Sequence, residues 1–285
     1  MRRQRLLFAV VLALSVTLAG CSALDTGGDQ TDAGPGETNG TIPDDISEQV
    51  IESIASVEKY RVEATQTQTI IGPQRQSVET EQRVDVNRAD QRLHRTTNQT
   101  VLGRTIRTDT YLANETVYQR SPVYVQQFST EWIEVDTEGN VTRAFRAADP
   151  LARQSRVLET ASFEANGTET IDGRDVYRIE ADADPEQLED LFAELVGGPG
   201  TQFNESTYSL TDATYTFRVA ADTNRPLRVT GELESQVVAQ GQEVTLRQSF
   251  DFEYNYTSSV SIDLPEAASS AVPLSEILNG TDPGT

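Results

Sequence analysis

The stretch "EVTLRQSFDFEYNYTSS", residues 243–259, alternates between apolar and polar residues over most of its length. Its apolar set, interrupted at Gln248, is Val244, Leu246, Phe250, Phe252, Tyr254 and Tyr256. Because successive side chains of a strand point to opposite faces, this period of two predicts a long β-strand with one buried and one solvent-facing side. A sheet with one apolar face must pack against another layer, so the stretch also constrains the fold.

Similar alternation predicts strands over most of the chain from Arg61 onward. Residues 213–238 have the pattern of a hairpin whose turn lies at 222–226, where Asp, Asn and Pro gather. Residues 103–120 predict a second pair of strands that turns near Asn114. The sheet on which the fold depends is therefore long and consists largely of hairpins.

Three segments have the pattern of helices that could cover this sheet. In the first, residues 46–60, Asp45 and Glu48 have the spacing of a capping box. Its apolar stripe is Ile46, Val50, Ile51, Ile54 and Val57. Asp149-Pro150 opens the second, which runs to about Ser162, and Asp184-Pro185 opens the third, which "GGPG" from Gly197 ends. The third is lined by Leu188, Leu191, Phe192 and Leu195. These segments and the strands predict one α+β domain of about 220 residues.

The first 20 residues, "MRRQRLLFAVVLALSVTLAG", combine a basic start, a short apolar run and small residues, which is typical of a signal peptide. Leu18-Ala19-Gly20-Cys21 resembles the lipobox of prokaryotic lipoproteins. The resemblance implies that Cys21 receives a lipid, palmitate or an archaeal lipid, and becomes the new N-terminus. The alternatives are a plain cleaved signal and an uncleaved anchor, and either the Sec or the Tat export route is possible.

These features predict four parts of the chain. Residues 1–20 are a signal peptide, and residues 21–43 hold the lipidated Cys21 and a flexible acidic tether. Residues 44–268 are the folded domain, and residues 269–285 are a polar C-terminal tail.

The composition is strongly acidic, with 45 Asp and Glu against 23 Lys and Arg and a formal net charge of −22. Such an excess of acid with almost no lysine is typical of haloarchaeal proteins, and an acidic bacterial surface protein is the alternative. Nucleic acid is not an expected partner, because binding phosphates needs clustered basic residues. We expect a protein anchored by its lipid at the extracellular face of the cell membrane; its oligomeric state stays open.

Eight of the ten asparagines are followed by x-Ser/Thr. They are Asn39, Asn98, Asn114, Asn140, Asn166, Asn204, Asn255 and Asn279. Each sequon is an acceptor site only on an exported chain. Together they predict an N-glycosylated surface protein; the alternative is that Asn-x-Thr merely suits turns and exposed strands.

The sequence offers no catalytic constellation. His94 is the single histidine, and its place between arginines on a predicted strand favours a solvated position. Asp182, Asp184 and Glu186 could suggest a calcium site, but Pro185 and the spacing favour helix capping. Zinc sites of the Cys/His type need more such ligands than this chain has. We therefore predict a protein that is not an enzyme, with no metal site and no cofactor.

Four short strings carry a resemblance to a known family. They are "VIESIASVEKYRVEATQTQTI", "TETIDGRDVYRIEAD", "YTFRVAADTNRPLRVTGE" and "FDFEYNYTSSVSIDLPEAA". They are similar to segments of the LppX/LprG-type lipoproteins, which belong with the lipoprotein carriers of the LolA type. This resemblance covers about Asp44 to Ala268. It implies a strongly curved antiparallel sheet, a half-barrel, with helices on its concave face and an apolar cavity for acyl chains.

Two functions follow as hypotheses. The first is a lipid-anchored surface protein that binds or carries a hydrophobic, lipid-like ligand, or a lipoprotein, near the membrane. Burial of acyl surface, about 0.8 kcal/mol for each CH₂ group, would drive such binding. The alternative is a glycosylated envelope or regulatory module that binds no small molecule, and a filled core would favour it.

Overall fold

The computed structural model describes residues 42–280 apart from gaps at 73–74, 102, 138, 189–207, 240–241 and 258. The strands are β1 (Lys59–Ile71), β2 (Arg75–Asn87), β3 (Arg92–Val101), β4 (Arg104–Ala113), β5 (Thr116–Arg120), β6 (Trp132–Asp136), β7 (Ser162–Ile171), β8 (Arg174–Asp182), β9 (Tyr208–Ala220), β10 (Pro226–Ala239), β11 (Gln242–Asn255) and β12 (Val272–Pro273). The helices are α2 (Ile46–Ala55), α3 (Pro122–Phe128), α4 (Val141–Ala148), α5 (Pro150–Thr160), the 3-10 turn η2 (Glu266–Ser270) and α7 (Leu274–Gly280).

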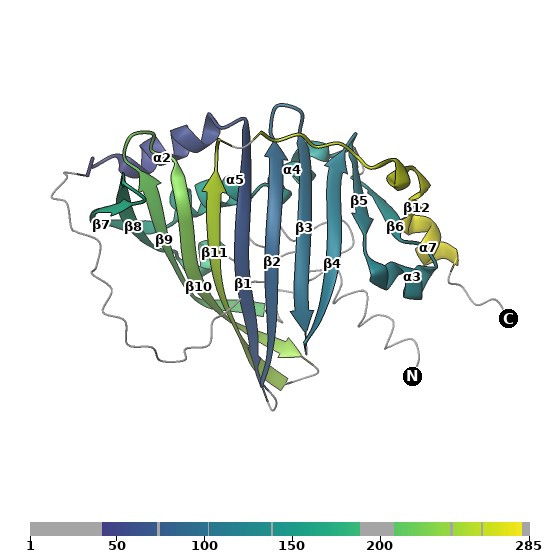
Figure 1. The fold of residues 1–285 in the computed structure, drawn as a ribbon. Coiled ribbons are helices and arrows are strands. Elements are labelled where there is room, and N and C mark those ends of the chain that lie inside the picture. Colours follow the sequence, from purple (N-terminus) through teal and green to yellow (C-terminus); the bar gives the residue numbers. More distant parts are fainter. Residues whose placement is uncertain are drawn as a thin grey trace.

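All twelve strands belong to one open sheet, in the order β12-β6-β5-β4-β3-β2-β1-β11-β10-β9-β8-β7. Neighbouring strands are antiparallel except β12, which runs parallel to β6. Figure 1 shows the sheet curving around α4 and α5, with α2 along one end of its strands. The predicted α+β class, a curved sheet with helices on its concave side, is confirmed.

The stretch at 243–259 forms β11 in the middle of the sheet, paired with β1 on one side and β10 on the other. Phe252 and Tyr254 are buried, whereas Glu253 and Asn255 between and after them are exposed, as the alternation predicts. The ring of Phe250 lies against Gly231 on β10, where an added Cβ would sit 2.5 Å from the ring. Glycine at 231 therefore lets an aromatic ring lie flat on the sheet.

Helix α2 packs its apolar stripe into the core: Ile46, Val50 and Ile54 are buried, and Ile51 is half-buried. The predicted capping box is wrong, because Asp45 at the N-cap makes no side-chain capping bond. Its carboxylate instead accepts a 2.8 Å hydrogen bond from the Gln49 side chain. Burial of the stripe, rather than the cap, therefore holds this helix.

Helix α5 begins as predicted. Asp149 is its N-cap and accepts from the Ala152 N–H, and Pro150 follows in the first turn. Leu151, Val157 and Leu158 of α5 are buried in the core. The helix therefore packs through one apolar side, which faces the sheet.

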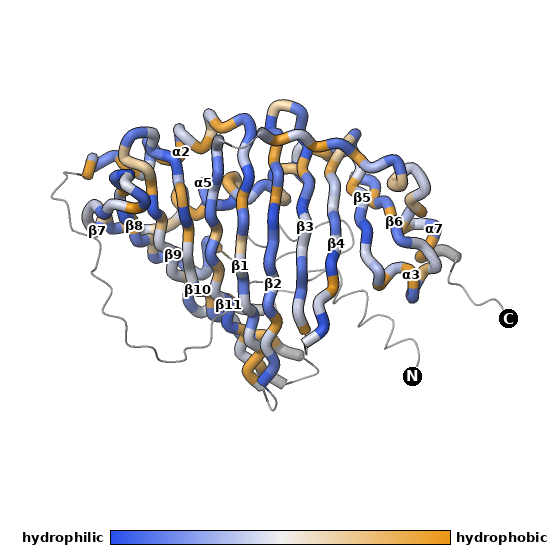
Figure 2. The backbone as a smooth tube through the Cα atoms, in the orientation of Figure 1, coloured by the Kyte–Doolittle hydropathy of each residue, from blue (hydrophilic) through white to orange (hydrophobic). Residues whose placement is uncertain are grey.

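The hydrophobic core lies between these helices and the sheet. Its largest fully buried side chains include Tyr60, Phe217, Leu93, Leu112 and Leu151. Figure 2 shows hydrophobic and hydrophilic residues alternating along the central strands. One side of the sheet therefore faces the core and the other faces solvent.

The fold extends past residue 268, where the sequence predicted the domain to end. Val272–Pro273 pairs with Ile133 and Glu134 of β6, and α7 follows directly. Among the described helices, none has the length and apolar character needed to cross a membrane.

Candidate functional site

The inner face of the sheet is the side that carries Tyr60 and Val62 of β1 and Val84 and Val86 of β2, all buried in the core. Register extends this face across neighbouring strands, because residues paired directly opposite one another point the same way. One cross-strand row runs from Tyr254 on β11 through Val62 and Val84 to Arg95 on β3. An arginine thus points toward the core.

A satisfied polar network, here called the Arg88 network, lies beside this row. Arg88 Nε donates to Asp149 Oδ2 at 2.7 Å, and its Nη1 donates to the Ile54 carbonyl. The Tyr60 hydroxyl donates to Asp149 Oδ1 and accepts from the Leu151 N–H at 3.2 Å. The network joins β1, the β2–β3 turn, α2 and the start of α5.

A second polar set, here called the Arg95 group, consists of Arg95, Arg153, Gln154 and Tyr254. The side chains of Arg95, Gln154 and Tyr254 are buried, with exposed fractions of 7%, 5% and 7% for these residues. Arg95 Nη2 donates to the Ala148 carbonyl at 2.8 Å. Arg95 Nε has no hydrogen-bond partner within the described part of the chain. Gln154 Oε1 and the Tyr254 hydroxyl make no hydrogen bond of ordinary geometry there, although Gln154 lies close enough to act on the pKa of Tyr254.

The electrostatics of the two sets differ. Burial opposes the charge of Arg88, but the hydrogen bond and charge of Asp149 outweigh it and raise the pKa of Arg88. Burial, reinforced by the positive charge of Arg153, lowers the pKa of Arg95 to about 10. Burial raises the pKa of Tyr254, which therefore stays protonated and can donate. The Arg95 group is thus positively charged at neutral pH.

The other half of the inner face is aromatic. The rings of Tyr215, Phe250 and Phe252, here called the aromatic strip, lie in series with centroids 5.3 Å apart. Phe250 is half-buried. Farther along the same face, five apolar residues are also only half-buried: Ile70, Val78, Val101, Ile106 and Leu246. Figure 1 shows α2, α4 and α5 near the opposite end of these strands.

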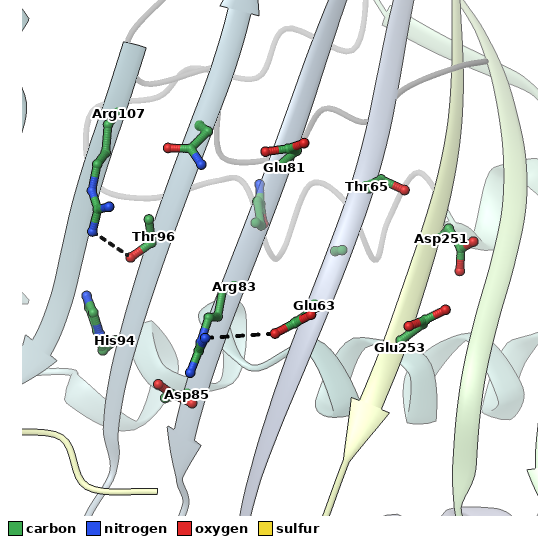
Figure 3. A pocket seen from close by; sticks show the side chains of 13 residues that line it. Glu63, Thr65, Glu81, Arg83, Asp85, His94, Thr96, Arg107, Asp251 and Glu253 are labelled. Carbon is green, nitrogen blue, oxygen red and sulfur yellow. Dashed lines mark hydrogen bonds and ion pairs between the residues drawn. The ribbon is translucent and has the colours of Figure 1, made fainter. Parts of the chain in front are cut away.

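The outer face carries a shallow groove of about 680 Å³. Figure 3 shows its charged side chains reaching out from β1, β2, β3, β4 and β11, among them Arg83 beside Glu63 at 3.9 Å. Arg61 likewise pairs with Asp85 at 2.5 Å, and Arg228 pairs with Asp251. Five carboxylates and two arginines line this groove, so it is acidic, and ion pairs engage several of these charged groups.

His94 lies at this groove and is half-buried, so the predicted solvated position is only partly right. Its ring stacks on Tyr111 with centroids 4.1 Å apart, and its Nε2 lies 3.6 Å from Asp109 Oδ1. Burial would raise the pKa of Asp109, but His94, Arg107 and Thr96 hold it well below its ordinary value. His94 therefore takes part in a local packing and charge cluster.

Asp184 caps the start of the next helical turn, as predicted, by accepting from the Glu186 N–H at 3.0 Å. Across the described ranges, no three His, Cys, Asp or Glu side chains are grouped so that they could hold a metal ion.

The sequon asparagines fall mostly on exposed positions. Four are exposed: Asn114, Asn140, Asn166 and Asn255. Asn114 occupies the β4–β5 turn with φ 52°, and Asn140 caps α4 by accepting from the Arg143 N–H. Asn98 is half-buried on β3 at the outer groove. Asn279 lies in α7. Cys21, Asn39 and Asn204 lie outside the described residues.

Together these features define a protein with one open, curved sheet whose inner face carries the Arg95 group and the aromatic strip, with α2, α4 and α5 near one end of its strands. Residues 43–272 match the sequence model of DUF6612, a family of unknown function, and the chain belongs to this family. No curated protein matches the sequence significantly.

Solved structures similar to the chain include lipoprotein LppX of Mycobacterium tuberculosis, with 13% identity, a TM-score of 0.40 and coverage of 76% of this chain and 96% of LppX. LprF of Mycobacterium bovis gives 13% identity, a TM-score of 0.44 and coverage of 78% and 95%. A LolA superfamily protein of Nitrosomonas europaea has 11% identity and a TM-score of 0.28, and the match covers 78% of this chain and 94% of that protein. Likeness at this level carries no information about the ligand of this chain.

Proposed function

We propose that this chain is a binding protein, not an enzyme, which holds an amphiphilic, lipid-like molecule between the inner face and its helices. The division of the inner face supports the proposal: the aromatic strip lies on β9 and β11, and buried polar side chains lie on β2 and β3. An apolar tail gains about 0.8 kcal/mol for each buried CH₂ group on such a surface. A polar head gains when buried groups acquire partners.

Half-buried apolar residues also support this proposal. Ile70 and Leu246 face each other across β1 and β11 on the inner face. Each keeps part of its surface exposed, although both lie on the side of the sheet that elsewhere forms the core. Covering such surface with an acyl chain removes apolar area from water.

The test uses the full chain and 1-dodecanol, with binding measured by calorimetry. Leu246→Arg places a charge on the inner face, and we expect it to weaken binding at least tenfold. Thr245→Arg, one residue earlier on the opposite face of β11, is the matched control and should bind like wild type. Equal affinity of the two variants, or no binding by wild type, would contradict the proposal.

We also propose that the protein is tethered to the extracellular face of the membrane by a lipid on Cys21. A flexible tether of the length of residues 21–43 would span a few tens of Å at about 5–6 Å times the square root of its length. Cys21→Ser removes the sulfur that would accept the lipid, so the protein should leave the membrane fraction or stay unprocessed. A Cys21→Ser protein as firmly membrane-bound as wild type would require another anchor.

Glycosylation of the exposed sequons is proposed on the same grounds. Asn114, Asn166 and Asn255 are exposed, so solvent reaches them, although Asn166 Nδ2 donates to Glu180 and Asn255 accepts from Thr257. Peptide mass spectrometry of native material should find at least one of them modified. If every sequon peptide is unmodified, the alternative holds, namely that Asn-x-Thr merely suits turns and exposed strands.

A further inference from the structure

Half-buried Arg88 and buried Arg95 reach adjacent residues at the junction of α4 and α5. Arg88 donates to the Asp149 carboxylate, whereas Arg95 donates to the Ala148 backbone carbonyl. A carbonyl offers a dipole, not a charge. Arg95 is therefore a buried cation with no carboxylate partner in the described residues, in a chain that has about two acidic residues for each basic one.

The surroundings increase this imbalance. Arg153 on α5 lies close enough for its positive charge to act on both Arg95 and Tyr254. Two like charges near a low-dielectric core repel each other, and burial without a counter-charge costs free energy. Buried polar atoms in native proteins nearly always have partners, so this set calls for a physical explanation.

The donors are of the kind that binds an anion. Arg95 Nε–H has no acceptor within the described structure, and the protonated Tyr254 hydroxyl, which lies near Gln154, makes no hydrogen bond of ordinary geometry there. Gln154 has a carboxamide, and rotating it exchanges its acceptor and its two donors. A guanidinium beside a second arginine suits a carboxylate or a phosphate, whose oxygens accept several charge-assisted hydrogen bonds.

We propose that the Arg95 group binds the anionic headgroup, a carboxylate or a phosphate, of an amphiphile whose tail lies along the aromatic strip. The inference rests on the proposed function and names the class of its ligand. Register supports it, because Tyr254 is in the row of Arg95 and Phe252 is two residues away on the same face of β11. A molecule bound at Tyr254 thus reaches the aromatic strip directly.

The test compares four probes on the full chain at one fixed salt concentration: dodecanoate, dodecyl phosphate, 1-dodecanol and inorganic phosphate. The first three share a tail and differ in charge, and the fourth has the charge without a tail. Charge-assisted hydrogen bonds in a buried site correspond to about a tenfold to hundredfold change in affinity. We expect the two anionic amphiphiles to bind at least tenfold more tightly than dodecanol, and inorganic phosphate to bind far more weakly.

Arg95→Met keeps the length of the side chain and removes its charge, and it should abolish the preference for anions while dodecanol still binds. The matched control is Arg247→Met, which replaces an exposed arginine on the outer face of β11 and should keep the preference for anionic amphiphiles. Arg95→Lys keeps the charge and should retain part of the preference, which guards against a folding defect in Arg95→Met.

The outcomes separate the inference from the function on which it rests. If dodecanol binds as tightly as both anions, or Arg95→Met keeps the preference, the headgroup inference is wrong and the binding function stands. If inorganic phosphate binds as tightly as dodecyl phosphate, the site binds a free anion, and the proposal that its ligand is an amphiphile is wrong. If no amphiphile binds, the function and the inference both fail.

Discussion

Half-buried Arg88 and buried Arg95 both donate to the junction of α4 and α5, yet their surroundings differ. The guanidinium of Arg88 meets a carboxylate, and that carboxylate also accepts from Tyr60 and caps α5. Arg95 meets one backbone carbonyl and the field of a second arginine. Removing one partner of a buried charge pair is strongly destabilising, whereas a buried charge that lacks a partner already costs stability unless something else supplies one.

The largest expected loss of stability is in the Arg88 network, where each polar group named above has a partner. Asp149→Ala leaves the half-buried Arg88 and the buried Tyr60 hydroxyl without their carboxylate and removes the cap of α5. We expect a loss of about 3–5 kcal/mol in the free energy of unfolding, the usual consequence of breaking a buried pair. Urea unfolding followed by circular dichroism measures it.

The control is Asp251→Ala, which breaks the ion pair with Arg228 on the outer face. Partly exposed pairs are worth at most about 1 kcal/mol, so this variant should change little. Equal losses in the two variants would mean that burial does not distinguish the Arg88 network.

Replacing one tyrosine in each polar set, Tyr60 in the Arg88 network and Tyr254 in the Arg95 group, should change stability less than Asp149→Ala does. Tyr60→Phe removes a hydroxyl that joins Asp149 to the Leu151 N–H, and we expect a loss of about 2–3 kcal/mol. Tyr254→Phe removes a buried hydroxyl that lies near Gln154 but makes no hydrogen bond of ordinary geometry in the described structure, and should be neutral or slightly stabilising. Thermal melts of the ligand-free proteins measure both; a larger loss for Tyr254→Phe would reverse the comparison.

The carboxylate of Asp109, on the outer face of the sheet, accepts hydrogen bonds from its neighbours. Thr96 donates to it at 2.9 Å, as does Arg107, and its pKa is held well below the ordinary value. Asp109→Asn should lose about 1–2 kcal/mol at pH 7, since charge-assisted hydrogen bonds disappear.

The sign of the pH dependence follows from the lowered pKa. The contribution of Asp109 is fully present above the unfolded pKa of about 3.9 and is lost as pH falls through the lower folded pKa. The difference between wild type and Asp109→Asn should therefore be constant from pH 7 to about 5 and shrink below about 4. Chemical unfolding at several pH values tests this; a difference that grows in acid would show that the sign is wrong.

The smallest expected effect is the most informative for function. Arg95→Met replaces an incompletely satisfied buried cation by an apolar chain of similar length, so the ligand-free protein should keep its stability or gain up to about 1 kcal/mol. Denaturant titration measures the change. A loss comparable to that of Asp149→Ala would make Arg95 a structural residue like Arg88 and remove the distinction between the two regions.

Local pattern predicted much of the fold. The alternation around Phe252 and Tyr254 predicted both the strand and its buried side, and Asp149-Pro150 predicted the start of α5. Such features depend on a few neighbouring residues. The capping box of Asp45 failed because two geometries compete for the same carboxylate, and its bond with Gln49 replaced the cap.

The Arg95 group was not predicted, although part of the signal was present. Leu93 is buried, so the period of two places Arg95 on the same side of β3. Its neighbours come from β11 and α5, however, about 60 to 160 residues later in the sequence. Long-range register and helix packing decide such a group, and neither can be read from one segment.

The two edges of the sheet differ in a way that affects how copies of this protein meet. Edge strand β12 has two residues, but β7 has ten and, among the described strands, pairs with β8 alone. The bulge between Ala165 and Thr168, where Gly167 takes φ 108°, divides β7 into two short paired runs. An unpaired edge is a template for aggregation, and a bulge shortens the run of backbone groups that a second chain could use. The bulge therefore acts as a built-in barrier to fibre-like stacking.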